Sequence, residues 1–169
     1  MYETLLNKYG VNQMGYYVKD AEEAAALHSR LFGSGPFVVC EVGVDKAFCR
    51  GKEVDLRLKV AFGQHAGLQV EIIQVLSADP NAYFEMGRYG FHHVSIWTDD
   101  IDRTIAEFEA EGFPVAMLMF SGPMKIAYFD CREALGYYVE CHMPTPEVWA
   151  AHAAAARDWD GKDPVRVVG

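Results

Sequence analysis

The chain has 169 residues, of which 51% are hydrophobic and 13% aromatic, and its formal net charge is −9 at pH 7. This length and apolar content suit one compact domain, or two small modules that share a core. The negative charge and the lack of a basic run argue against nucleic acid as a partner. No stretch approaches about 20 consecutive apolar residues, so we expect no membrane-spanning segment.

Two further features bear on the compartment in which the chain works. The first residues, MYETLLNKYG, lack the basic and then apolar pattern of a secretory signal. The four cysteines, at positions 40, 49, 131 and 141, are scattered and form no CxxC pair. We therefore expect reduced, buried thiols and a cytoplasmic location.

The first half of the chain is predicted to run strand, helix and then about three strands. Residues 10–20, GVNQMGYYVKD, have a glycine, an apolar residue, two polar residues and then a mainly apolar run, and are predicted to form a strand. Residues 21–33, AEEAAALHSRLFG, have apolar residues at helical spacing, with Asp20 placed to cap the helix and Gly33 to end it. Strand-like runs follow as PFVVCEV, VDLRLKVAFG and LQVEIIQV, at 36–42, 54–63 and 68–75.

The second half repeats the first. Residues 76–90, which include Pro80 and Asn81, are predicted to be a surface linker between the halves. Residues 90–100, GFHHVSIWTDD, then align with residues 10–20 at an offset of eighty. A helix is expected at 101–113, and strands are expected at 113–120, 124–130 and 137–143.

The repeat places polar residues at matching positions of the two halves. Gln13 aligns with His93 on the first strand, and Glu71 aligns with Glu140 on the last. Side chains alternate between the faces of a strand, so His93 and His92 are expected to point in opposite directions. His92 is therefore expected to face helices or solvent, and either to support a ligand residue or to be structural.

The two strand-and-helix starts, the FGSGPF turn and the strands ending VEIIQ and VECH resemble the vicinal oxygen chelate superfamily of glyoxalases, bleomycin-resistance proteins and dioxygenases. The resemblance covers residues 10 to about 145 and is closest to the branch of methylmalonyl-CoA epimerase and glyoxalase I. It implies an α+β fold in which two βαβββ modules curl their mixed sheets around one metal site. The chain would be a single domain, 1–169, with modules at 10–75 and 91–144, the linker at 76–90, and a C-terminal helix and tail at 145–169.

The same resemblance implies the ligand set, because each module of that superfamily supplies one ligand from its first strand and one from its last. The matching residues are Gln13, Glu71, His93 and Glu140, a set similar to that of the zinc form of glyoxalase I. The epimerase branch usually has His in place of Gln13 and often Gln in place of Glu71. One imidazole, one amide and two carboxylates suit one divalent metal per chain, zinc first, with nickel, cobalt, manganese or magnesium as alternatives.

Such a metal would polarise a substrate carbonyl, and Glu140 and Glu71 would be the catalytic acid and base. We therefore expect an epimerase or isomerase, or a glyoxalase-like lyase, that acts on a small molecule with adjacent oxygens, such as an acyl thioester or an α-hydroxycarbonyl. A non-catalytic protein that binds aromatic or drug-like molecules, of the bleomycin-resistance type, is the alternative. An extradiol-type dioxygenase is disfavoured, because the Fe(II) triad uses two histidines and this set offers one.

The sequence also suggests a partner subunit and the residues that surround the substrate. A helix at about 145–159 carries Trp149 and Trp159, and the apolar surface that it offers predicts a homodimer. The basic residues that could bind the phosphates of a CoA ester are Arg57, Lys59, Arg88 and Lys125. The side chains expected to form an apolar pocket wall are Phe37, Trp97, Met119 and Tyr128.

Overall fold

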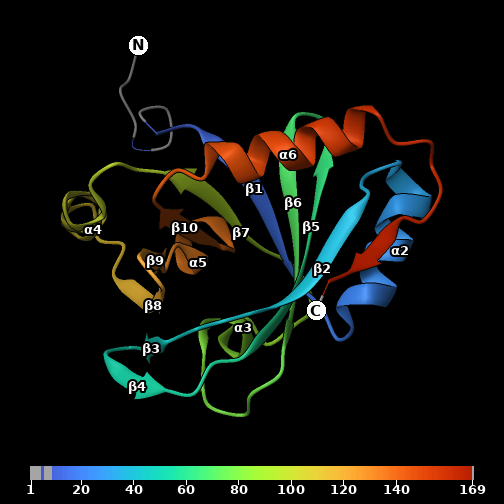
Figure 1. The fold of residues 1–169 in the computed structure, drawn as a ribbon. Coiled ribbons are helices and arrows are strands. Elements are labelled where there is room, and N and C mark those ends of the chain that lie inside the picture. Colours follow the sequence, from blue (N-terminus) through green and yellow to red (C-terminus); the bar gives the residue numbers. More distant parts are fainter. Residues whose placement is uncertain (1–4, 6–8, 169) are drawn as a thin grey trace.

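The computed structural model describes residue 5 and residues 9–168 (Figure 1). In this part of the chain the strands form one mixed sheet with the order β11-β2-β5-β6-β1-β7-β10-β9-β8-β3-β4. The sheet curls without closing, and α2 and α4 lie on its outer side (Figure 1). The predicted fold class, with curled mixed sheets built from repeated strand and helix units, is confirmed.

The strands and helices predicted for both halves are present. The first half contains β1 (Val11–Tyr17), α2 (Ala21–Phe32), β2 (Phe37–Val42), β5 (Leu58–His65) and β6 (Leu68–Val75). The second half contains β7 (Gly90–Trp97), α4 (Ile101–Ala110), β8 (Val115–Ser121), β9 (Met124–Phe129) and β10 (Tyr138–His142). Asp20 and Asp100 cap α2 and α4, because their carboxylates accept hydrogen bonds from backbone N–H groups of the first turns.

The two halves meet through their first strands. β1 pairs antiparallel with β7, and each of these strands pairs in parallel with the last strand of its own half, β6 or β10. The first and last strands of both halves are therefore neighbours in the order β6-β1-β7-β10. The two halves that are similar in sequence therefore also pair their strands in the same way, on either side of the β1–β7 contact.

Several elements were not expected from the sequence. They are the hairpin β3 (Lys46–Cys49) and β4 (Lys52–Val54), the short helices α3 (Ala82–Glu85) and α5 (Arg132–Leu135), and β11 (Val165–Val167). β3 leaves the first half and pairs with β8 of the second half. α3 lies inside the stretch predicted to be a surface linker, yet its Ala82 and Tyr83 are buried. The linker therefore contributes to the core, and its description as a surface segment was wrong.

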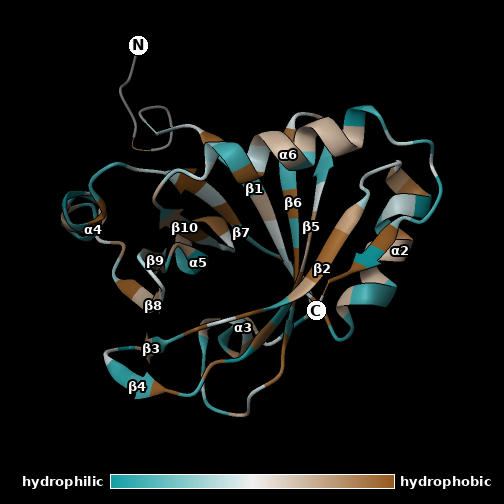
Figure 2. Ribbon diagram, in the orientation of Figure 1, coloured by the Kyte–Doolittle hydropathy of each residue, from teal (hydrophilic) through white to brown (hydrophobic). Residues whose placement is uncertain are grey.

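The apolar residues form a central core inside the curl and two layers outside it. The inner core includes Tyr17, Ile73, Tyr83, Met117 and Tyr138. The outer layers lie between α2 and strands β2, β5 and β6, and between α4 and strands β7, β9 and β10. Figure 2 shows hydrophobic residues along the strands and hydrophilic residues on much of α2 and α4. Within the described residues, no helix combines the length and apolar character that crossing a bilayer requires.

The last helix, α6 (Pro146–Arg157), crosses one end of β1, β6 and β5 (Figure 1). His152 stacks on Phe62 of β5 with ring centroids 6.0 Å apart, so α6 packs on its own sheet. Val148 keeps 53% of its surface exposed. The homodimer predicted from this helix stays a prediction.

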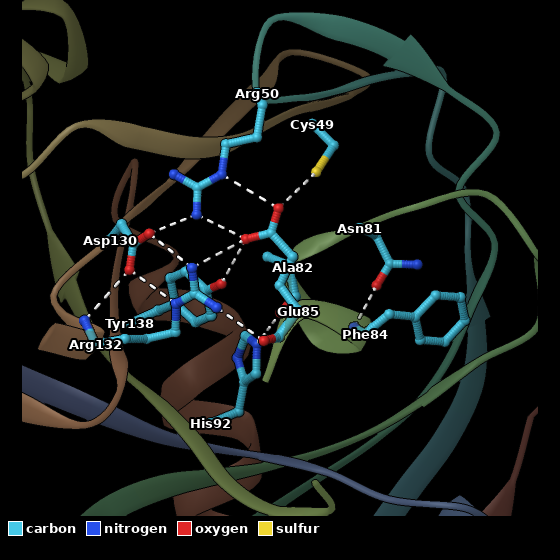
Figure 3. A network of polar contacts seen from close by, with 10 residues as sticks. All are labelled: Cys49, Arg50, Asn81, Ala82, Phe84, Glu85, His92, Asp130, Arg132 and Tyr138. Carbon is cyan, nitrogen blue, oxygen red and sulfur yellow. Dashed lines mark hydrogen bonds and ion pairs between the residues drawn. The ribbon is translucent and has the colours of Figure 1, made fainter. Parts of the chain in front are cut away.

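A network of ion pairs closes the opposite end of the curl (Figure 3). Glu85 of α3 accepts hydrogen bonds from Arg50, in the β3–β4 turn, and from Arg132 of α5. Both guanidinium groups also pair with Asp130. The hydroxyl of Tyr138 donates to Glu85 Oε2 at 3.0 Å. The network therefore joins the linker helix, the crossing hairpin and the second half of the chain.

We expect this network to stabilise the fold in a pH-dependent way. The Arg132 guanidinium, together with Arg50, outweighs the effect of burial and holds the pKa of Asp130 well below its usual range. A carboxyl whose folded pKa is lowered stabilises the fold above its unfolded pKa and loses that effect as the pH falls. Asp130→Asn should therefore lower the free energy of unfolding by about 2 kcal/mol at neutral pH. The deficit should shrink in acid, below about pH 4.

Urea denaturation followed by circular dichroism at several pH values measures this effect. Glu53→Gln is the control, because Glu53 forms an exposed pair with Lys46 and should contribute little. A deficit for Asp130→Asn that is the same at every pH would contradict the electrostatic explanation.

Candidate metal site

The residues singled out by the repeat lie on four adjacent strands. Gln13 is on β1, Glu71 on β6, His93 on β7 and Glu140 on β10. All four point to the inside of the curl, where Gln13 and Glu140 are 4% exposed and His93 is fully buried. Strand pairing has thus brought together side chains that are up to 127 positions apart in the sequence (140 − 13).

Three of these side chains are within bonding reach of one ion. Nε2 of His93 lies 2.8 Å from Oε2 of Glu140 and 3.2 Å from Oε2 of Glu71. The ligand atoms of the three residues all lie within 4.8 Å of one another. Gln13 lines the same cavity as the two carboxylates.

Each of the four residues also has one buried polar atom that faces the site: Gln13 Oε1 has no hydrogen-bond partner, and the other three atoms contact only one another, at 2.8 and 3.2 Å. These atoms are Gln13 Oε1, Glu71 Oε2, His93 Nε2 and Glu140 Oε2. Buried polar atoms are normally hydrogen-bonded, and leaving one unsatisfied costs about 1–3 kcal/mol. Three oxygens and one imidazole nitrogen are a donor set that fits a divalent cation with room for exchangeable positions.

The orientation of the Gln13 amide is set by a chain of hydrogen bonds. Its Nε2 donates to Oε1 of Gln69 at 2.8 Å. Nε2 of Gln69 in turn lies 3.0 Å from Nδ1 of His152, whose pKa is lowered by burial so that the neutral ring can accept the bond. The amide nitrogen is therefore engaged, and the oxygen, which is the atom that binds metals, is left free.

The ionisable groups at the site shift one another's pKa values. Burial alone would lower the pKa of His93, but the Glu140 and Glu71 carboxylates outweigh it and raise the pKa to about 9. Burial raises the pKa of Glu71, whereas for Glu140 the attraction of His93 outweighs burial and lowers it. A positive group between the two carboxylates is thus what this environment favours.

The expectation that His92 points away from His93 was wrong. The β1–β7 register passes from Gly15 opposite His93 to Tyr16 opposite Phe91, so His92 is an extra residue in a β-bulge. The bulge interrupts the alternation of side chains and turns both histidines inward. His92 is fully buried, and its Nδ1 lies 3.0 Å from Nδ1 of His93. A bulge of this kind leaves no mark in a regular alternating pattern, which is why the sequence did not reveal it.

A cavity of about 180 Å³ lies between the two halves and beside α6, and Gln13, Glu71 and Glu140 form part of its lining. Its walls include the predicted Met119 and Tyr128, together with apolar side chains of β2, β5 and β9. Two of the predicted wall residues are elsewhere, because Phe37 packs in the layer below α2 and Trp97 lies in a separate surface hollow. His142 also lines the cavity, as expected for a residue on the same face of β10 as Glu140.

The basic residues considered for phosphate binding are not at the cavity. Arg57 pairs with Asp55, Lys59 with Glu22 and Lys125 with Asp102. Arg88 donates to the backbone carbonyl of Phe91 at 3.1 Å. Among the described residues that line the cavity, none is Lys or Arg.

The comparison with protein families agrees with this architecture. The sequence profile of the Glyoxalase/Bleomycin resistance protein/Dioxygenase superfamily matches residues 12–128. The chain belongs to this superfamily. The vicinal oxygen chelate fold that the resemblance implied is thereby confirmed. No curated protein sequence matches the chain.

Solved structures show the same fold at low sequence identity. A hypothetical protein from Bacillus halodurans C-125 is 19% identical, with a TM-score of 0.56 over 80% of this chain and 94% of that one. Methylmalonyl-CoA epimerase from Mycobacterium tuberculosis is 14% identical, with a TM-score of 0.53 over 83% of this chain and 91% of that one. At these identities the likeness concerns the fold alone.

Gly15 provides a test of how tightly the site is built. A Cβ atom added there would lie 1.9 Å from Cε1 of His93, whose ring is flanked by the rings of His92 and Tyr128. Gly15→Ala should therefore displace His93 and lower zinc affinity by about tenfold or more. Titration of the metal-free protein with zinc, in competition with a chelating dye, measures the change.

Gly63→Ala is the matched control. A Cβ atom at Gly63 would lie 2.6 Å from the ring of Phe37, which packs below α2 and outside the site. This variant should lose stability but keep its zinc affinity. Equal zinc affinities for Gly15→Ala and the parent would contradict the role assigned to Gly15.

Proposed function

We propose that this member of the vicinal oxygen chelate superfamily is a metal-dependent enzyme that removes a proton from a carbon next to a carbonyl group. The observation that supports this most is the buried cluster of Glu71, His93 and Glu140, whose ligand atoms lie within 4.8 Å of one another, with Gln13 and its unpartnered Oε1 in the lining of the same cavity. We propose these residues as the ligands of one divalent ion per chain, zinc first. When bound, such an ion would polarise the carbonyl and stabilise the enolate that proton removal creates.

The two carboxylates are the groups proposed to move the proton. Glu71 and Glu140 come from corresponding strands of the two halves, and they approach His93 Nε2 at 3.2 and 2.8 Å. Because the halves are related by a repeat about the β1–β7 pair, the two groups reach the site from opposite sides. Glu140 would take the proton and Glu71 would return it, which suits epimerisation or isomerisation. A lyase of the glyoxalase type would use the same groups.

A non-catalytic protein that binds an aromatic or drug-like molecule is the second candidate. The mainly apolar walls of the cavity support it, because such walls alone can hold an apolar ligand. A binding protein has no need of two buried carboxylates beside an imidazole, since burying charge is costly. The donor set therefore favours the enzyme.

Variants of the proposed ligands test the mechanism. His93→Ala should lose both metal and activity, because it removes one of four ligands. Glu140→Gln should keep its metal, since an amide oxygen can still coordinate, but proton exchange should fall by about a hundredfold or more. The measurement is loss of the α-proton to D₂O, followed by NMR on a panel of α-hydroxyketones and acyl thioesters, with metal content determined in parallel.

Glu109→Gln, on the exposed side of α4, is the matched control and should change neither the metal content nor the rate of proton exchange. Exchange by Glu140→Gln at the rate of the parent would rule out Glu140 as the base. A parent protein that cannot be loaded with any of the divalent metals would overturn the proposed site itself.

A further inference from the structure

The charge of the cavity restricts what it can bind. The cavity is lined mainly by aliphatic and aromatic side chains, such as Val60, Phe62, Met119 and Ile126. Its two acidic residues are Glu71 and Glu140, and among the described lining residues no Lys or Arg accompanies them. The uncharged polar groups come from Gln, Ser, Thr and Tyr side chains, with His142 beside them.

The net charge of the site with a bound metal follows from these lining residues. A divalent cation and two ionised carboxylates sum to zero, and the amide of Gln13 adds no charge. A substrate carboxylate or phosphate inside the cavity would therefore have no excess positive charge to pair with. Burying an unpaired charge costs far more than burying a neutral polar group.

The size of the cavity sets a second limit. A cavity of about 150 Å³ in another protein holds benzene. The volume here is about 180 Å³, which fits one ring or a short branched chain together with the two oxygens that face the metal. The pantetheine arm and the nucleotide of a CoA ester, or the peptide of a glutathione adduct, would have to lie outside.

We propose that the substrate is a small, uncharged α-hydroxycarbonyl compound with an aromatic or branched aliphatic body. This inference rests on the proposed function and narrows its substrate class. It sets the chain apart from an enzyme for anionic acyl-CoA esters. The neutral substrate would place its two oxygens at the metal and its apolar body among the side chains of β5, β8 and β9.

A matched pair of ligands tests the proposal on the zinc-loaded protein. 2-Hydroxypropiophenone is neutral, and 4-(2-hydroxypropanoyl)benzoate carries one carboxylate at the far end of the same ring. Calorimetry should show binding of the neutral compound, and NMR should show loss of its α-proton to D₂O. The charged compound, and methylmalonyl-CoA, should bind roughly tenfold more weakly or worse.

A gain-of-charge variant sharpens the test. Val148 lines the cavity from α6 and is 53% exposed, so Val148→Lys can place an ammonium group at the rim without burying it. This variant should shift the ratio of the two affinities several-fold toward the charged compound. Leu31→Lys, on the exposed surface of α2, is the control and should change neither affinity.

Three results would overturn the substrate class. They are no binding of the neutral compound at about millimolar concentration, equal or tighter binding of the charged compound by the parent, and turnover of methylmalonyl-CoA with a higher kcat/KM. None of them affects the metal content, which is measured separately. Failure of this inference is therefore distinguishable from failure of the proposed metal site.

A different observation, the contacts of His92, supports a second inference. Nε2 of His92 lies 3.3 Å from the backbone carbonyl oxygen of Ala82 (Figure 3), and its Nδ1 lies 3.0 Å from Nδ1 of His93. The ring is held between Tyr83 and Tyr138, with centroids at 4.6 and 4.9 Å. Both nitrogens of His92 are therefore engaged, and its orientation is fixed.

These contacts determine which nitrogen of His93 carries a proton. A carbonyl oxygen only accepts, so Nε2 of His92 is the donor to Ala82. In a neutral ring Nδ1 of His92 is then an acceptor, and Nδ1 of His93 must donate to it. When His93 is neutral, as a metal ligand must be, its lone pair is therefore on Nε2, the nitrogen that lies beside Glu71 and Glu140.

We infer that His92 is a positioning residue that selects the metal-binding tautomer of His93. The chain of contacts runs from Ala82 of α3 through both histidines to the proposed metal. Partners of this kind orient ligating histidines, and their loss typically lowers metal affinity by about 10- to 100-fold. The inference rests on the proposed metal site.

His92→Phe and His92→Asn separate hydrogen bonding from packing. The phenyl ring keeps the contacts with Tyr83 and Tyr138 but accepts no hydrogen bond, and zinc affinity should fall by about tenfold or more. The asparagine side chain is smaller but can accept from Nδ1 of His93, and affinity should recover most of that loss. A packing role predicts the reverse order, and that order, or an unchanged affinity in His92→Phe, would overturn the inference.

Nitrogen-15 NMR of the parent gives a readout that needs no variant. In the zinc-loaded protein, His93 should show a proton on Nδ1 and a metal-type shift on Nε2. Coordination through Nδ1 would overturn the role of His92 even if zinc binds tightly. A parent that binds no zinc would instead overturn the proposed metal site.

Discussion

The antiparallel pairing of β1 with β7 is the constraint on which the rest of the structure depends. It puts the first strands of both halves in the middle of the sheet and leaves each last strand next to its own first strand. Only with this pairing do residues from four strands meet inside one curl. Gly15 makes the pairing compatible with a buried imidazole, because the space that a side chain would occupy is filled by His93.

Burying the ionisable groups of the site opposes folding, and the fold places these groups together. Two carboxylates and an imidazole lie in an interior that is mainly apolar and aromatic. Water reaches them poorly, so their charges interact strongly and must balance locally. A divalent ion, proposed here, would balance the two carboxylates without a further basic residue. The same balance would leave a neutral substrate as the one that the cavity accepts most easily.

The two ends of the curl are closed in different ways. α6 covers one end and reaches the site through the hydrogen bonds that join His152, Gln69 and Gln13. At the other end, the ion pairs of Glu85 and Asp130 fix α3, whose Ala82 contacts His92 (Figure 3). Segments outside the repeat therefore hold the side chains that the repeat supplies. Disrupting α6 or the ion-pair network around α3 is therefore expected to disorder the side chains of the site, although neither change is at the site itself.

The sequence by itself determined the repeat, the caps at Asp20 and Asp100, and the matching positions of Gln13 and His93 within the repeat, because these depend on local patterns along the chain. Only the tertiary structure decided the position of His92, since a one-residue bulge reverses a side chain without changing the strand pattern. Likewise, the crossing of β3 to β8 and the burial of α3 depend on contacts between distant segments. The charge of the cavity also required the fold, because ion pairs elsewhere hold Lys59 and Lys125 away from it.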